Sequence, residues 1–273
     1  MEKFLKIFKR NQVIIGMIHL KALPGTPGYA NNNVEILETA LKEAALYKKA
    51  GIDALAIENM HDVPYIKNEV GHEISAMMTL IGSQIKQTTQ LPCGIQILSS
   101  ANRAAMAVAK AANLDFIRAE GFVFGHLADE GYIDSCAGDL LRYRKQINAE
   151  EIAVFTDIKK KHSSHALTSD ISLEETAKTA EYFRSDGLII TGTSTGEEAN
   201  IEEVKAVKNA CKIPVIVGSG VTIENLEIYL SIADALIVGS WFKEGGYWEN
   251  ALNYDKIIRF MEEAKRIRKL SLM

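Results

Sequence analysis

The chain has few cysteines, and those it has do not form a pattern. Cys93, Cys136 and Cys211 are the only three among 273 residues, and no two form a CxxC pair. An odd, scattered set of cysteines excludes the disulfide framework of a small secreted domain. We therefore expect a reducing compartment, the cytoplasm.

Long apolar runs and an excess of positive charge are also absent. No 18 consecutive apolar residues occur, and the amino terminus lacks the apolar core and small-residue cleavage site of a signal peptide, so we expect neither export nor a membrane span. A net charge of -4 and a pI near 5.9 argue against a general nucleic-acid binder. With only 5 prolines there is no sign of a long disordered linker.

Short apolar, β-branched segments alternate with longer segments whose apolar residues recur at helical spacing. This alternation predicts an α/β fold with one (β/α)8 barrel over residues 1–273, close to the roughly 250 residues typical of that barrel, preceded by a helical extension at 1–12 against the barrel bottom. An open doubly wound sheet is the alternative, disfavoured because no complete GxGxxG follows a first strand. The predicted strands are Val13–His19, Ala54–Asn59, Gly94–Leu98, Phe116–Glu120, Ala153–Ile158, Leu188–Thr191, Val215–Gly218 and Ala235–Gly239.

The last two predicted strands each end in a Gly-Ser pair. Glycine lets the main chain approach a ligand closely, and loops after strands seven and eight of this barrel frequently bind phosphate. The segment thus predicts one phosphate site shared by both loops, with assistance from the sixth strand. Its residues are Gly192, Thr193, Gly218, Ser219, Gly220, Gly239 and Ser240.

Polar residues accumulate where the predicted strands end, the half of the barrel that carries catalysis. Glu58 and Asp157 directly follow apolar runs, where a charge must be paired, hydrated or functional. His19 precedes a Pro- and Gly-rich loop able to reach over the barrel mouth. Lys159 begins a run of three lysines that favours a solvated loop, yet strand alternation could direct Lys159 alone into the pocket. These four are the candidate acids and bases.

Four further residues are candidates for substrate binding: Asn59, Gln96, Arg118 and Glu120. Arg118 and Glu120, two apart on a strand, point to one face and could instead neutralise each other. Asn59 and Gln96 could equally serve as hydrogen-bonded barrel interior. Two other chemistries stay open: a Schiff base on Lys159, and a divalent metal held by residues drawn from His19, Glu58, His126, Asp157 and His162, whose spacing matches no metal motif.

Five motifs together resemble one known family, BtpA/SgcQ, also labelled photosystem I biogenesis proteins. They are IGMIHLKALPGTPGY, GIDALAIENMHDVPY, FIRAEGFVFG, VGSGVTIENL and ADALIVGSWFK, and the resemblance spans almost the whole chain. It implies a TIM barrel distantly related to phosphosugar isomerases, epimerases and synthases. Some relatives are linked to photosystem assembly, others to carbohydrate uptake and sugar-phosphate conversion.

The residues and the resemblance together predict an enzyme that uses acid–base chemistry on a phosphorylated sugar or a related small metabolite, of the isomerase, epimerase or lyase type. The alternative is a non-catalytic assembly factor with a vestigial phosphate site. Aromatic residues in predicted loops, such as Phe122 and Trp241, could anchor a homo-oligomer.

Overall fold

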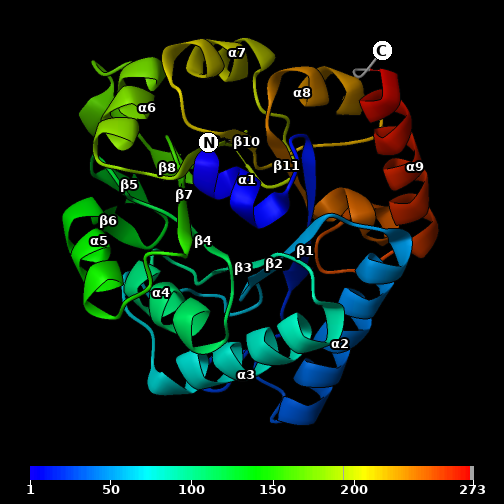
Figure 1. Ribbon diagram of the computed structural model, residues 1–273. Helices are drawn as coiled ribbons and strands as arrows, with labels where there is room; N and C mark the ends of the chain where they lie inside the picture. Colours follow the sequence, from blue (N-terminus) through cyan, green and yellow to red (C-terminus); the bar gives the residue numbers. More distant parts are fainter. Residues whose placement is uncertain (193, 271–273) are drawn as a thin grey trace.

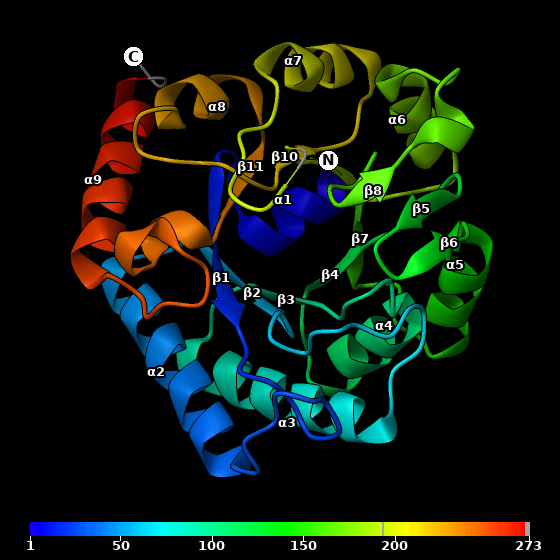
Figure 2. The same ribbon diagram turned by 180° about the vertical axis from the view of Figure 1, so that it is seen from behind.

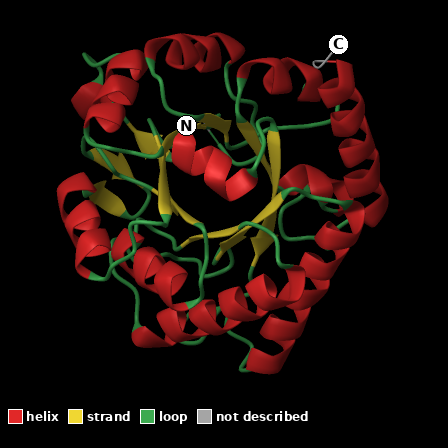
Figure 3. Cartoon of the chain, in the orientation of Figure 1, coloured by secondary structure: helices red, strands yellow, loops and turns green. Residues whose placement is uncertain are grey.

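Eight parallel strands close into a barrel in the computed structural model, which describes residues 1–192 and 194–270. Figure 1 shows the ring of strands, and Figure 3 shows the helices wrapped around it. The ring closes because the first strand pairs with the last, Val13 opposite Ala235, which rules out the open sheet. The barrel strands, in order around the ring, are β1 Val13–His19, β2 Ala54–Glu58, β3 Cys93–Gln96, β4 Phe116–Ala119, β7 Ala153–Asp157, β9 Gly187–Ile190, β10 Val215–Val217 and β11 Ala235–Val238.

All eight strands that the sequence predicts are present. Strand β1 has the predicted bounds, whereas each of the others ends one or two residues earlier than predicted. Buried residues continue past the end of the β-ladder, as at Asn59 and Leu98. Those residues begin the loops at the barrel mouth.

Helices cover the outside of the barrel, and polar side chains mark where several of them begin. The side chains of Asn32, Ser172 and Asn200 accept hydrogen bonds from the first turns of α2, α6 and α7. The hydroxyl of Tyr47 on α2 donates to the carbonyl of Met17, which fixes this helix against β1. The helices are α1 Glu2–Phe8, α2 Asn33–Ala50, α3 His72–Thr89, α4 Asn102–Ala111, α5 Ala137–Gln146, α6 Leu173–Tyr182, α7 Ile201–Ala210, α8 Leu226–Ile232 and α9 Tyr254–Leu270.

The amino-terminal helix α1 lies across the open centre of the strand ring (Figure 1). Its buried Phe8 stacks on Phe155, Phe4 meets the same ring edge-on, and Phe8 also contacts Phe116, 5.7 Å between ring centroids. Because Phe116 is the first residue of β4, α1 closes the amino-terminal end of the barrel. The expected short helix therefore forms the barrel floor.

A small antiparallel sheet, absent from the sequence prediction, adds to the opposite end. It consists of β5 His126–Ala128, β6 Gly131–Ile133 and β8 Ser163–Ser164, in the order β6-β5-β8. The first two strands lie in the connection after β4 and the third follows β7, so these two long loops are hydrogen-bonded to each other (Figure 2). We call this sheet the flap.

Side chains inside the barrel alternate with those that face the helices, as expected of strands. In β1, Val13, Ile15 and Met17 join the interior cluster, and His19 follows at the next inward position. The same register brings polar side chains to the top of the interior on β2, β3, β4 and β7. The apolar lower layers thus support a polar upper layer.

Other expectations from composition concern membranes and cysteines. Within the described residues no helix is both long and apolar enough to cross a membrane. All three cysteines are free thiols, and Cys93 and Cys211 are buried.

Truncating the barrel floor should destabilise the whole protein. Phe4→Ala removes a ring that is 1% exposed, and we expect the free energy of unfolding to fall by about 3–5 kcal/mol in urea titrations. Leu5→Ala, on the same helix but 40% exposed, is the matched control and should change stability by no more than about 0.5 kcal/mol. Equal effects of the two variants would contradict the role given to α1.

Candidate active site

Six side chains form a polar ring at the top of the barrel interior. Each faces the barrel interior in the last two positions of a strand or directly after it. This is the carboxyl end of the strands, where we expected these residues from the sequence. All are largely buried, and charged members therefore need partners. They are His19, Glu58, Gln96, Arg118, Glu120 and Asp157.

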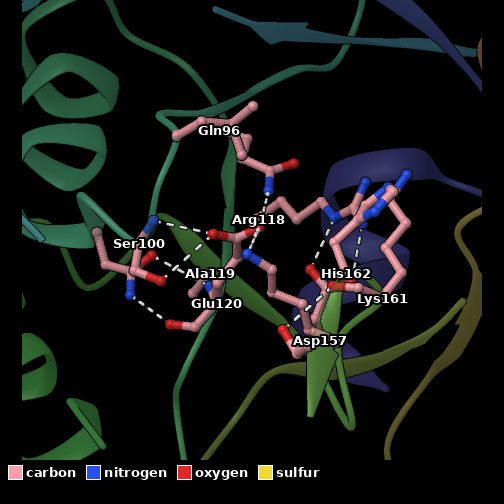
Figure 4. Close-up of polar contacts among 12 residues, drawn as sticks. Gln96, Ser100, Arg118, Ala119, Glu120, Asp157, Lys161 and His162 are labelled. Carbon is pink, nitrogen blue, oxygen red and sulfur yellow. Dashed lines mark hydrogen bonds and ion pairs between the residues drawn. The ribbon is translucent and has the colours of Figure 1, made fainter. Parts of the chain in front are cut away.

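The strongest interaction in this ring joins Arg118 to Asp157. Nε and Nη2 of Arg118 donate to the two carboxylate oxygens of Asp157, each at 2.8 Å (Figure 4). Burial alone would lower the pKa of Arg118, but the charge and hydrogen bonds of Asp157 outweigh it and raise that pKa. Of the alternatives left open for Arg118, direct pairing with Glu120 is not what the structure shows, because the guanidinium reaches across to Asp157 on the neighbouring strand.

Glu120 is held by a separate set of partners. Its carboxylate accepts from Gln96 Nε2 at 3.0 Å and from the main-chain N–H of Ser100 at 2.9 Å, and it lies 3.4 Å from the amine of Lys160. The two buried carboxylates at the ends of β4 and β7 are thus both bound by protein groups. Neither is left for proton transfer without breaking those contacts.

Glu58 is the carboxylate with the fewest fixed contacts in the ring. Its Oε2 lies 3.6 Å from Nε2 of His19. Burial raises the pKa of Glu58, although the nearby Arg118 and Lys161 charges oppose the rise. Burial, together with the charge of Lys243, lowers the pKa of His19 to about 3, so its imidazole is neutral at neutral pH. A carboxyl with raised basicity beside a neutral imidazole is a common acid–base arrangement.

The lysine run after β7 has a different geometry from the predicted one. Lys159 has a φ of 47°, which ends the strand alternation, and its amine donates to the carbonyl of Ile171 at 2.6 Å, away from the ring. Lys160 is buried against Glu120, and Lys161 lines the central cavities. The prediction that Lys159 enters the pocket is wrong in this respect: Lys161 does so, and the run is not simply a solvated loop.

Lys161 was missed because only its position in the loop distinguishes it from its neighbours. Its amine lies 3.3 Å from Oγ1 of Thr195, in the loop that follows β9. Burial lowers the pKa of Lys161, and the charge of Arg118 lowers it further. The amine is therefore a better proton donor than an exposed lysine.

The two glycine loops line a cavity of about 180 Å³ directly beside these groups. Gly218, Ser219 and Gly220 follow β10, while Gly239 and Ser240 follow β11, as predicted. His19, Glu58, Arg118 and Lys161 line the same cavity from the other strands. One cavity thus brings together five of the predicted phosphate-binding residues and three of the residues predicted for catalysis or substrate binding, His19, Glu58 and Arg118.

Not every N–H group of these loops faces an empty space. The N–H of Gly218 donates to the carbonyl of Ile190, whereas those of Gly220 and Ser240 have no acceptor among the described residues. Gly220 has a φ of 65°, and a Cβ there would lie 2.3 Å from the carbonyl oxygen of Glu197, so only glycine fits.

The predicted assistance from the sixth barrel strand is not visible at Gly192. Its N–H donates to Oγ of Ser219 at 2.7 Å, and that hydroxyl donates in turn to the carbonyl of Glu197 at 2.9 Å. Gly192 lines a separate cavity with Lys159 rather than the central one. Thr193 lies outside the described residues. These contacts connect the β9 and β10 loops instead of adding to the cavity wall.

Asn59 braces the main chain. Its Nδ2 donates to Asp62 at 2.8 Å, and its Oδ1 accepts from the N–H of Leu98 at 2.7 Å. It is not among the described residues that line the two central cavities, so its predicted role in substrate binding becomes a structural one. Met60, Thr195 and Trp248, which do line them, come from loops without a sequence signal.

The residues considered as metal ligands are not gathered into one cluster. No group of three or more His, Cys, Asp or Glu side chains in residues 1–192 and 194–270 has the arrangement of a metal site. His126 instead lies beside His165, 5.6 Å between ring centroids, and His162 contacts Thr195.

Comparison with known proteins identifies the lineage. A sequence profile described as the BtpA family matches residues 10–266. The chain belongs to the BtpA family. A Caenorhabditis elegans member, named as an uncharacterized mitochondrial protein F13E9.13, is 47% identical over 94% of each chain. The photosystem I biogenesis protein BtpA of Synechocystis is 30% identical over 93% of this chain and 88% of its own.

Solved structures with the same barrel include two enzymes of phosphorylated compounds. (S)-3-O-geranylgeranylglyceryl phosphate synthase from Thermoplasma acidophilum matches 97% of this chain and 98% of its own, with a TM-score of 0.60 and 17% identity. Orotidine 5'-phosphate decarboxylase from Pyrococcus horikoshii matches 92% and 99%, with a TM-score of 0.58 and 14% identity. At these identities the likeness shows that this BtpA family member is a TIM barrel.

The neutral state of His19 should make stability depend on pH. The pKa of His19 is depressed to about 3 in the folded state, so below the usual 6.5 the unfolded chain takes up a proton that the folded protein does not. Stability is then fully present above about pH 6.5 and falls towards pH 3, by up to about 1.4 kcal/mol per pH unit from this group. Urea titrations of wild type and His19→Gln between pH 7 and pH 4 should show the smaller decline in the variant. The exposed His72→Gln should follow the wild-type curve, and parallel curves for all three proteins would contradict the assignment.

Breaking the central ion pair should be far more damaging than breaking an exposed one. Asp157→Ala leaves the buried Arg118 charge without its partner, and we expect a loss of about 3–5 kcal/mol in the free energy of unfolding. Glu202→Ala, which breaks the exposed pair with Lys205, should lose no more than about 1 kcal/mol. The double variant Arg118→Met/Asp157→Leu should recover much of the loss, since no charge is then stranded. A double variant as unstable as Asp157→Ala would refute this account.

Proposed function

We propose that the protein is an enzyme that transforms a small phosphorylated metabolite by acid–base chemistry. One observation supports this most directly: a single cavity has the glycine loops of β10 and β11 on one side and Glu58, His19 and Lys161 on the other. A ligand whose phosphate lies at the loops would have its carbon skeleton over these three groups.

The loops offer what a phosphate requires. The N–H groups of Gly220 and Ser240 are unengaged within the described chain, and glycine permits close approach of the main chain. The cations Lys161 and Arg118 line the same cavity and add positive potential. In barrels of this class such loops frequently hold the phosphate of the substrate.

Glu58 is the proposed base. Its raised pKa makes it a stronger base than an exposed carboxylate, and it is the ring carboxylate not tied to an arginine or to main-chain N–H groups. It would remove a proton from the carbon next to a carbonyl. The neutral His19 and the amine of Lys161 would stabilise the oxygen of the resulting enolate and return a proton, the shared first half of isomerase, epimerase and lyase reactions.

Asp157 and Lys159, which we predicted from the sequence as candidate acid–base groups, do not transfer protons in this proposal. Asp157 keeps Arg118 in place through two hydrogen bonds, so it orients the cavity wall. Lys161, and not Lys159, would be the amine beside the ligand. Lys161 would therefore also be the lysine that forms a Schiff base if the reaction takes that route. The cytoplasm remains the predicted compartment, although the name of the C. elegans relative places that protein in mitochondria.

A non-catalytic assembly role is the competing function, supported by the name of the Synechocystis relative. It requires no chemistry at Glu58. The two functions therefore differ in whether a bound phosphorylated compound is turned over.

Two variants should separate binding from chemistry. Ser240→Asp puts a carboxylate at the proposed phosphate position and should abolish the thermal stabilisation that phosphorylated sugars give to the wild type, an effect that scales as RT ln(1 + [L]/Kd). Glu58→Gln should keep that stabilisation but slow the exchange of the substrate's carbon-bound proton in D2O, followed by NMR, by about 10²–10⁴-fold.

Ser231→Asp, on the exposed surface of α8, is the matched control for the added charge and should retain both properties. Stabilisation of Ser240→Asp equal to that of wild type would reject the phosphate site. Binding without proton exchange or product in the wild type would favour the assembly role.

A further inference from the structure

A second cavity of about 300 Å³ adjoins the first at the barrel mouth. The two share Glu58, Arg118 and Lys161 in their walls, so one ligand can extend from one into the other. Gln96, at the end of β3, and Glu120, directly after β4, also line the second cavity. Glu130 from the flap and Trp248 from the loop before α9 complete this part of its wall. It is the region farther from the glycine loops.

Gln96 brings an unpartnered hydrogen-bond acceptor to the wall of this second cavity. Its Nε2 donates to Glu120, whose carboxylate can only accept, and this fixes which end of the amide faces away (Figure 4). The remaining Oε1 has no hydrogen-bond partner in residues 1–192 and 194–270, and Gln96 is only 3% exposed. A buried amide oxygen without a donor is costly, and a ligand hydroxyl would satisfy it.

Glu130 supplies a second acceptor to the wall of the same cavity. It lies in the two-residue turn between β5 and β6, and Gly131 with a φ of 102° makes this turn feasible. Oε2 of Glu130 is buried and also lacks a hydrogen-bond partner among the described residues. The flap thus brings a carboxylate to the cavity that no barrel strand could provide.

The cations around the cavity each already have one protein partner. Arg118 is bound to Asp157, Lys160 lies against Glu120, and Lys161 donates to Thr195. Within the part of the chain that the structure describes, two acceptors in the cavity wall have no donor: Oε1 of Gln96 and Oε2 of Glu130. An occupant that fits it must bring several hydrogen-bond donors of its own.

We propose that the second cavity is a hydroxyl-binding subsite and that the substrate is a phosphorylated polyhydroxy compound. This rests on the proposed function, since the phosphate lies in the first cavity and the hydroxyl-bearing end in the second. Gln96 Oε1 accepts a hydrogen bond from one substrate hydroxyl and Glu130 accepts from another. The indole ring of Trp248 packs against the C–H groups of the substrate. Glu130 is then a specificity residue contributed by the flap.

The test compares ligands that share a phosphate but differ in donors. Dissociation constants of inorganic phosphate, glycerol phosphate, D-ribose 5-phosphate and 2-deoxy-D-ribose 5-phosphate should fall as hydroxyls are added, by about three- to tenfold for each, the net effect of one neutral hydrogen bond. In Glu130→Gln and Gln96→Met this dependence on hydroxyl number should shrink towards onefold, with the affinity for inorganic phosphate unchanged. Glu69→Gln, an exposed acid on the neighbouring loop after β2, should behave as wild type.

The outcomes separate this proposal from the one it rests on. Phosphate binding with equal affinity along the series would overturn the subsite and leave the proposed function standing. Failure of every phosphorylated ligand, inorganic phosphate included, would overturn both. Glucosamine 6-phosphate binding more tightly than glucose 6-phosphate would show that the acceptors select an ammonium group, which would also overturn the hydroxyl assignment. Unfolding temperatures of the unliganded variants identify any that fail to fold, and Glu130→Gln, at the edge of the flap, keeps the test available if Gln96→Met is unstable.

Discussion

The ion pair between Arg118 and Asp157 determines how charge is distributed over the top of the barrel. Two full charges inside a protein are tolerated only in contact, and the two parallel hydrogen bonds fulfil that condition. With Arg118 committed to β7, Glu120 takes its donors from Gln96, Ser100 and Lys160. Glu58 is left opposite a neutral imidazole. The reactivity assigned to Glu58 is therefore a result of pairings made by its neighbours.

The direction of side chains could be predicted from the sequence within the strands, but not beyond the strand ends. Alternation places His19 and Glu58 inward because each is an even number of residues from an apolar interior position of the same strand. It places Gln96 inward because Cys93 and Ile95, an odd number of residues away, pack on the outer side of β3. It fails at Lys159, where a left-handed φ ends the extended backbone. As a result Lys161, and not Lys159, lines the central cavities. The pairing of Arg118 was equally hidden, since its partner lies on another strand and both Glu120 and Asp157 were chemically suitable.

Loop residues were out of reach for a different reason. Thr195 and Trp248 enter the cavity walls from irregular segments, and Glu130 enters from a hairpin of three-residue strands too short to produce a periodic signal. The glycine loops were predictable because they directly follow strong apolar strands. Even there, Ser219 uses its hydroxyl to join the β9 and β10 loops, which the composition of the motif does not reveal.

The aromatic floor of the barrel also bears on traffic through the molecule. Phe4 and Phe8 join the interior cluster that continues upward through Phe155 and Ile15 to Met17, just beneath the polar ring. An apolar layer thus separates the polar ring from the helix at the barrel bottom, and we expect solvent and ligands to reach the cavities from the mouth. Because the flap contributes Glu130 to a cavity wall there, we expect the release of a bound compound to depend on how these two short hydrogen-bonded loops move.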